Sequence, residues 1–114
     1  VFSVERIKPL VRKSRENLRE LKIRNVIVKH ANGFDGWEED KKFDGIICAA
    51  APRQYPQELV ELLEVGGKLV IPAGNEGQQK LYVITRKSES ENEETIHEEV
   101  AFVPMLPGIS NGEI

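Results

Sequence analysis

The segment 43–52, FDGIICAAAP, constrains the fold more than any other part of the chain. Two lysines precede it, and its apolar residues continue without interruption from Ile46 to Ala51, where Pro52 stops the run. A short apolar run between such breakers is typical of a fully buried strand. Small alanines at its carboxyl end leave room for a ligand, and open α/β sheets bind ligands just outside the carboxyl ends of their strands. The segment therefore predicts a buried strand at 43–49 that ends at a ligand site.

The remaining pattern alternates strands and helices. A helix is expected after Glu5 and Arg6, with Pro9 tolerated in its first turn, and a second helix at 55–63, ended by Gly66 and Gly67. Strands are expected at 1–4, 25–29, 68–71, 81–86 and 96–103, with loops at 34–42 and 88–95 and an irregular tail at 104–114. The residues expected to face inward from the helices are Ile7, Leu10, Val11, Leu18, Leu21, Tyr55, Leu59, Leu62 and Leu63. This order predicts a Rossmann-like α/β fold, a mostly parallel sheet with an antiparallel carboxyl-terminal hairpin.

Composition narrows the class of protein. A length of 114 residues predicts a single domain over 1–114, and 16 basic against 19 acidic residues give a net charge of −3, which argues against a nucleic-acid binder. We find no apolar run near the roughly 20 residues of a membrane span and no signal-peptide pattern. Cys48 is the single cysteine, so a cytoplasmic location is expected. His30 and His97 lack ligand-like spacing, and no metal site is expected.

Three places could carry chemistry. Glu5 follows a strand and precedes a helix, where a carboxylate can accept hydrogen bonds from both hydroxyls of a nucleotide ribose. Alternatively, it is simply an exposed glutamate that the dipole of the helix stabilises. Asn32 and Gly33 follow the second strand, where they form either a plain turn or a contact with a base edge. The small residues at the end of the segment 43–52 suit either a rigid backbone that faces a ligand or the end of a buried strand. The glycine-rich turn expected about 20 residues before such an acid would lie before Val1.

Five segments together resemble the protein-L-isoaspartate O-methyltransferases, in that family's order and spacing. They are VFSVERI at 1–7, HANGFDGW at 30–37, FDGIICAAAP at 43–52, GGKLVIPAG at 66–74 and FVPM at 102–105. The resemblance implies a Rossmann-like methyltransferase fold, S-adenosylmethionine as the methyl donor, and isoaspartyl residues of damaged proteins or peptides as the methyl acceptor.

The resemblance also implies roles for single residues. Glu5, Asn32, Gly33 and Ala49 would contact the cofactor, and Asn32 departs from the aspartate that the family usually carries there. The substrate-binding candidates are Ala50, Ala51, Pro52, Val103 and Pro104. No catalytic side chain is expected, because a substrate carboxylate is already ionised and needs alignment and desolvation rather than a base.

The resemblance further implies that an amino-terminal half with the glycine loop is absent, so that the domain is partial. The absent first strand would lie between the strands at 1–4 and 43–49, and this chain alone would be inactive unless that half is supplied. Two alternatives remain: a Rossmann-like module that has lost its cofactor site, and a methyltransferase with another acceptor, such as RNA or a small molecule.

Overall fold

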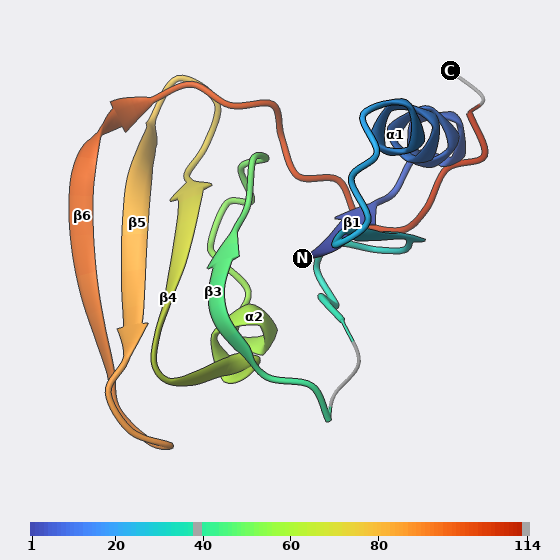
Figure 1. Cartoon of the computed structure of the whole chain (residues 1–114). Coiled ribbons are helices and arrows are strands. Elements are labelled where there is room, and N and C mark those ends of the chain that lie inside the picture. Colours follow the sequence, from blue (N-terminus) through green and yellow to red (C-terminus); the bar gives the residue numbers. More distant parts are fainter. Residues whose placement is uncertain (38–39, 113–114) are drawn as a thin grey trace. The chain divides into compact units, whose positions relative to one another are not determined.

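A computed structural model describes residues 1–37 and 40–112, which belong to two compact units. The first unit contains residues 1–37 and the chain from Pro107 onward, and the second contains the residues between them. Figure 1 shows the elements in chain order: β1 (Phe2–Glu5), α1 (Lys8–Glu20), β2 (Ile27–His30), β3 (Phe43–Ile47), α2 (Gln57–Glu61), β4 (Leu63–Ala73), β5 (Gln79–Arg86) and β6 (Asn92–Val100).

The first unit is a strand–helix–strand motif. β1 and β2 pair in parallel from Phe2 opposite Ile27 to Glu5 opposite His30, and α1 connects them. Pro9 lies in the first turn of α1, as expected, where its missing N–H costs nothing.

Two of the residues expected to face inward from α1 do not. Val11 is buried and Leu18 is half-buried, but Leu10 is 43% and Leu21 70% exposed. Leu10 precedes Val11 by one residue, which is about 100° around a helix, and Leu21 lies at the C-cap, beyond the last turn. The buried face of the helix is therefore narrower than the sequence pattern predicted.

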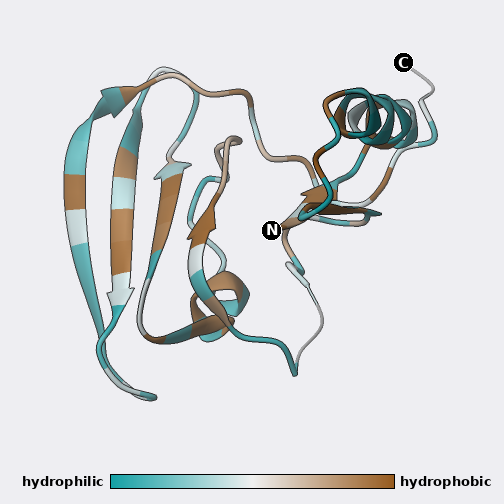
Figure 2. Ribbon diagram, viewed as in Figure 1, coloured by the Kyte–Doolittle hydropathy of each residue, from teal (hydrophilic) through white to brown (hydrophobic). Residues whose placement is uncertain are grey.

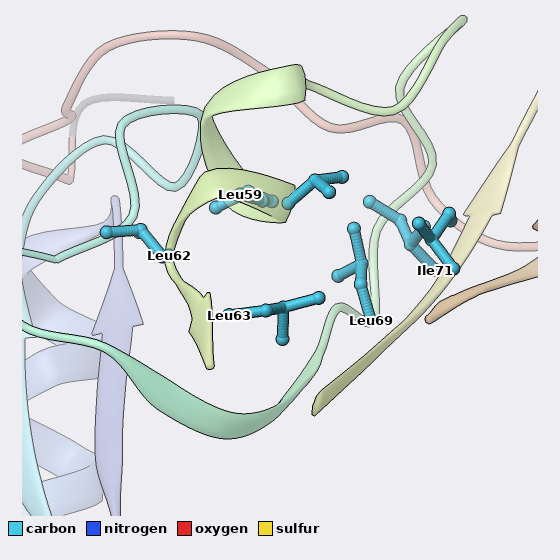
Figure 3. Packing of buried hydrophobic residues seen from close by; sticks show 7 residues of the cluster. Leu59, Leu62, Leu63, Leu69 and Ile71 are labelled. Atoms are coloured by element: carbon cyan, nitrogen blue, oxygen red, sulfur yellow. The ribbon is translucent and has the colours of Figure 1, made fainter. Parts of the chain in front are cut away.

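The second unit contains a four-stranded sheet in the order β3-β4-β5-β6. β3 and β4 are parallel, whereas β4–β5 and β5–β6 are antiparallel. The predicted α/β class with an antiparallel carboxyl-terminal hairpin is confirmed, and the sheet is mixed. Figure 3 shows the core beneath α2, formed by Leu59, Val60, Leu62, Leu63, Leu69, Ile71 and Ile84.

The second helix is shorter than predicted, and Gly66 and Gly67 do not end it. α2 stops at Glu61 and β4 already begins at Leu63, so both glycines lie inside the strand. Gly67 has no room for a Cβ atom, which would lie 2.9 Å from the Asp44 carbonyl oxygen. A glycine is thus required where β4 passes close to β3, at the irregular register between Phe43 and Gly45.

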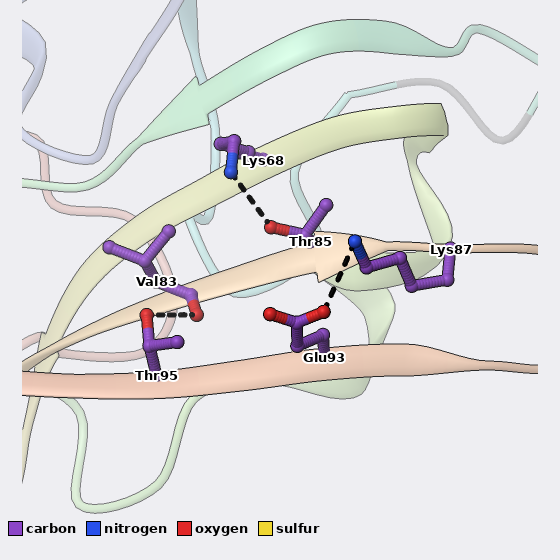
Figure 4. Close-up of polar contacts among 6 residues, drawn as sticks. All are labelled: Lys68, Val83, Thr85, Lys87, Glu93 and Thr95. Carbon is purple, nitrogen blue, oxygen red and sulfur yellow. Dashed lines mark hydrogen bonds and ion pairs between the residues drawn. The ribbon is translucent and has the colours of Figure 1, made fainter.

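The closing hairpin is also longer than predicted. β6 begins at Asn92 rather than at residue 96, and it ends at Val100. An exposed ion pair of Lys87 and Glu93 at 3.1 Å lies at the start of β6, and Lys68 of β4 donates a hydrogen bond to Thr85 of β5 at 3.1 Å (Figure 4). None of the helices in the described part of the chain is long and apolar enough to cross a membrane.

Candidate functional site

Glu5 is the last residue of β1, at the carboxyl end of a parallel strand. One carboxylate oxygen, Oε2, accepts a hydrogen bond from the Ile7 N–H at 3.2 Å. The second oxygen has no hydrogen-bond partner among the residues that the structure describes, and the side chain is half-buried. Glu5 therefore keeps acceptor capacity for a ligand at this edge while its own orientation is held by the backbone.

Asn32 and Gly33 lie beside Glu5 in the first unit, because the Ala31 N–H donates to the Glu5 carbonyl at 3.1 Å. The Asn32 side-chain oxygen accepts from the Phe34 N–H at 3.1 Å, which forms an Asx turn. The expected turn is present, but neither residue adopts a positive φ; Gly36 does, at 66°. The Asx hydrogen bond makes the turn without the left-handed backbone that an Asn-Gly pair readily accepts.

A small network behind Glu5 was not predicted from the sequence. His30 Nε2 lies 2.9 Å from the Arg6 carbonyl oxygen and 3.1 Å from that of Ser110. Both partners are acceptors, so this nitrogen carries the proton. Ser110 also forms a bridge to Ile7, which ties the carboxyl-terminal tail to the segment after β1. A tail without periodicity gives no sequence signal for this contact.

Arg6 is a second residue that the sequence pattern missed. Its Nε atom is buried and has no hydrogen-bond partner among the described residues. A buried guanidinium nitrogen without an acceptor among the described residues is costly. The signal in the sequence is weak: a basic residue directly after the acid at a strand end.

The second group of candidates lies in the second unit. The Ala51 N–H donates to the Val103 carbonyl at 2.7 Å, and the Met105 N–H donates to the Ala51 carbonyl at 2.9 Å. Ala51 also forms an isolated bridge with Pro104. The structure thus places the segments 49–52 and 103–105 side by side, although fifty residues separate them in the sequence.

These residues differ in accessibility. Ala51 and Pro52 are buried, and the Pro52 carbonyl accepts the Gly74 N–H at 3.0 Å. Ala49 is exposed and Ala50 is half-exposed, while the Val103 side chain is 67% exposed. Ala49, Ala50 and Val103 therefore offer accessible side chains in this unit, and Ala51 and Pro52 hold the backbone of the segment in place.

Cys48 fits the interpretation of an inert thiol. Its sulfur donates to the Ala50 carbonyl at 3.4 Å and lies 3.8 Å from the Met105 sulfur. Burial raises the pKa of the Cys48 thiol above its usual value, and the Ala50 carbonyl opposes this only in part. A thiol with a raised pKa is protonated at neutral pH and is a poor nucleophile. No cluster of residues that could hold a metal ion occurs within 1–37 and 40–112.

Comparison with known proteins places these features in a family. The family model of protein-L-isoaspartate(D-aspartate) O-methyltransferase matches residues 1–109. The protein-L-isoaspartate O-methyltransferase of Methylobacillus flagellatus is 50% identical over 111 residues, which are 95% of this chain and 49% of that protein. The enzyme of the same name from Nitrosomonas eutropha is 49% identical over 111 residues, covering 97% and 49%.

The solved structures agree. A Plasmodium falciparum protein, assigned to the same family and crystallised with S-adenosyl-L-homocysteine, superposes with a TM-score of 0.80 at 35% identity; the match covers 93% of this chain and 52% of that one. The chain spans about half the length of the relatives that it matches. Since the family model matches residues 1–109, the chain belongs to the protein-L-isoaspartate(D-aspartate) O-methyltransferase family.

Proposed function

We propose that the protein containing this chain is a cytoplasmic repair enzyme that transfers a methyl group from S-adenosylmethionine to the carboxylate of isoaspartyl residues in damaged proteins or peptides. The observation that carries this proposal is the family match over residues 1–109. Within these residues, Glu5 lies at the carboxyl end of β1 with one carboxylate oxygen still available to a ligand. Both units would belong to one methyltransferase domain that is completed by further residues.

The residues of the first unit fit a nucleoside ligand. Glu5 would accept hydrogen bonds from the ribose hydroxyls, for which a carboxylate is a strong acceptor. Asn32 and Gly33 would contact the adenine, and the Asn32 oxygen keeps one lone pair beyond its bond from Phe34. Ala49, which belongs to the second unit, is the remaining cofactor candidate from the family resemblance. The cofactor would supply an electrophilic methyl group when bound.

The methyl acceptor needs little from the protein besides position. A carboxylate is ionised at neutral pH, so transfer requires alignment and exclusion of water rather than a general base. Ala50, Val103 and Pro104 would contact the acceptor peptide, whereas Ala51 and Pro52, expected to bind it as well, are buried and would act by holding the segment in place. The bridge between Ala51 and Pro104 supports this because it holds the two segments together.

The strand order supports a requirement for the rest of the protein. Among the described strands, β1 pairs with β2 alone and β3 with β4 alone, and β1 and β3 belong to different sheets. An unpaired edge can accept a further strand. A strand from the missing amino-terminal half, predicted to lie between β1 and β3, would need such edges for pairing. That strand with its glycine loop would complete the cofactor pocket. We expect the isolated chain to be inactive.

The cofactor part of the proposal is tested with Glu5→Gln in the full-length protein. The variant keeps an acceptor for the Ile7 N–H but loses the charge. We expect S-adenosylhomocysteine to bind roughly tenfold to a hundredfold more weakly by calorimetric titration, since a hydrogen bond to a charged group is worth about 1.5–3 kcal/mol. Glu16→Gln, on the exposed side of α1, is the matched control and should bind as the wild type does. Equal affinity for all three proteins would contradict the role of Glu5.

Turnover tests the acceptor and the need for the remaining half. Labelled S-adenosylmethionine is incubated with an isoaspartyl peptide, and with the same peptide carrying normal aspartate. The full-length protein should methylate only the isoaspartyl peptide, and the isolated chain should methylate neither. Methylation of RNA or of a small molecule instead would favour another acceptor, whereas cofactor binding without any transfer would favour a non-catalytic module.

A further inference from the structure

We propose that a groove at the far end of the first unit from Glu5 and Asn32 binds an acidic peptide segment of a partner protein. The groove has a volume of about 510 Å³ and lies between the carboxyl end of α1 and the start of β2. Glu5 is the last residue of β1 and Asn32 follows the carboxyl end of β2, so this surface is separate from the proposed cofactor site. The inference therefore goes beyond the proposed function and does not depend on it.

The groove is basic at its rim. Four of its lining residues are basic and none is acidic: Arg15, Arg19, Lys22 and Arg24. All four side chains are exposed, and no ion pair within the described residues engages them. Lys8, Arg12, Arg15 and Arg19 are spaced four, three and four residues apart, so they extend the same charge along one face of α1. In Figure 2 most of the α1 ribbon has the colour of hydrophilic residues.

The floor of the groove is apolar. Leu18 and Val28 form its inner part, while Ile23 and Ile27 remain 40% and 54% exposed. The Arg15 side chain is held against the protein, because its Nη2 donates a hydrogen bond to the Val28 carbonyl at 2.7 Å. This bond covers part of the outer edge of β2 and fixes one basic group above the apolar floor.

The backbone at Lys22 supplies an independent observation. α1 ends in a Schellman motif, in which the Ile23 N–H donates to the Leu18 carbonyl at 2.9 Å and the Lys22 N–H to that of Arg19 at 3.1 Å. The left-handed position of this motif usually carries glycine, yet here Lys22 adopts it with a φ of 57°. A lysine at this strained position places a charge at the groove. The helix dipole favours cations within its last turn, but Arg15 and Arg24 lie outside that turn.

These features favour an acidic peptide over the other anionic partners. Nucleic acid presents a continuous line of phosphates, which would leave the exposed isoleucines of the groove floor uncovered. The net charge of −3 of the chain also disfavours binding to nucleic acid. A peptide with alternating acidic and apolar side chains meets both halves of the surface, because carboxylates pair with the rim and apolar side chains cover Ile23 and Ile27.

The test uses the full-length protein and fluorescence anisotropy. The probe is a short labelled peptide in which glutamates alternate with leucines, and a second peptide carries glutamine in place of glutamate. We expect the acidic peptide to bind, the neutral one to bind roughly tenfold more weakly, and added salt to weaken binding. A double variant, Lys22→Glu with Arg24→Glu, should lose binding at least tenfold, and Lys13→Glu with Lys80→Glu, two exposed lysines outside the groove, is the charge-matched control.

Lys22→Gly separates binding from folding. Glycine relieves the strained backbone, so the melting temperature should be equal or higher while affinity for the acidic peptide falls. The proposal is overturned if the acidic peptide does not bind, if the groove and control variants bind equally, or if duplex DNA binds more tightly through the same residues. Concentration-dependent self-association that the groove variants abolish would overturn it in favour of a second copy of this chain.

Discussion

At the scale of single residues, the fold perturbs the ionisation of Tyr55. Its hydroxyl donates to the Glu94 carboxylate of β6, and its ring lies 5.8 Å from that of Tyr82. Burial, the hydrogen bond and the charge of Glu94 raise the pKa of Tyr55 from 10.0 to about 12. The neutral phenol is thus favoured in the folded state. Its hydrogen bond to Glu94 links the segment before α2 to the hairpin.

This shift predicts how stability depends on alkaline pH. The folded pKa lies above the unfolded one, so the contribution of Tyr55 is fully present below pH 10.0 and is lost as the pH rises toward about 12. Urea unfolding of the wild type should show this loss, and Tyr55→Phe should show a smaller one. In a Tyr82→Phe background, absorbance titration of tyrosinate should place Tyr55 near 12, and Glu94→Gln should lower its pKa without restoring it fully, because burial remains. No change in Glu94→Gln would contradict the contact.

At the scale of elements, the turn from β4 to β5 depends on two glycines with different requirements. Gly74 and Gly77 both have positive φ, at 134° and 79°. A Cβ atom at Gly74 would collide with the Gln78 carbonyl oxygen and lie 3.0 Å from Gln79 Cα, whereas at Gly77 nothing lies within 4 Å. One position therefore needs both the backbone angle and the space, and the other needs only the angle.

The two alanine variants make a matched pair. Gly77→Ala should reduce the free energy of unfolding by about 1 kcal/mol, the cost of a left-handed backbone. Gly74→Ala adds a collision with backbone atoms and should cost roughly 2–4 kcal/mol. Urea unfolding of both variants measures the difference, and equal losses would show that the turn moves to make room at Gly74.

At the scale of the whole molecule, the buried apolar residues are distributed unequally. The core cluster of α2, β4 and β5 lies entirely in the second unit, whereas Val11 and Val28 are the buried hydrophobic residues described in the first. Buried apolar area is the main favourable term in folding, so the second unit should be the more stable of the two.

Hydrogen exchange followed by mass spectrometry tests this difference on the isolated chain. Amides of β4 and β5 around Leu69 and Ile84 should exchange slowest, and those of β1 and β2 should exchange much faster. In the full-length protein, β1 and β3 should gain protection because a further strand would pair with their free edges. Equal protection of both units in the isolated chain would contradict the unequal core.

Local patterns in the sequence were enough to place most elements. The run at 43–49 predicted the strand β3 but was wrong about its burial: no residue of Phe43–Ile47 is buried and Ile47 is 86% exposed, since β3 is an edge strand of the described sheet. The pair at 81–86 and 96–103 predicted the hairpin, and Pro9 predicted the start of α1. Glu5 is a site candidate from local sequence alone, because an acid at the end of a strand can be recognised from neighbouring residues; the structure places it at the end of β1. His30, Arg6 and Ser110 were missed because their contacts join segments that are distant in sequence and follow no period.

The sequence by itself determined the α/β class, the order of elements and the family, because periodicity, breakers and short motifs act over a few residues. Only the tertiary structure decided the bounds of β4 and the meaning of Gly66 and Gly67, since the Asp44 carbonyl that forbids a side chain at Gly67 belongs to another strand. The tertiary structure likewise brought Ala51 beside Pro104. Such contacts depend on which segments meet in space, and local patterns do not record this.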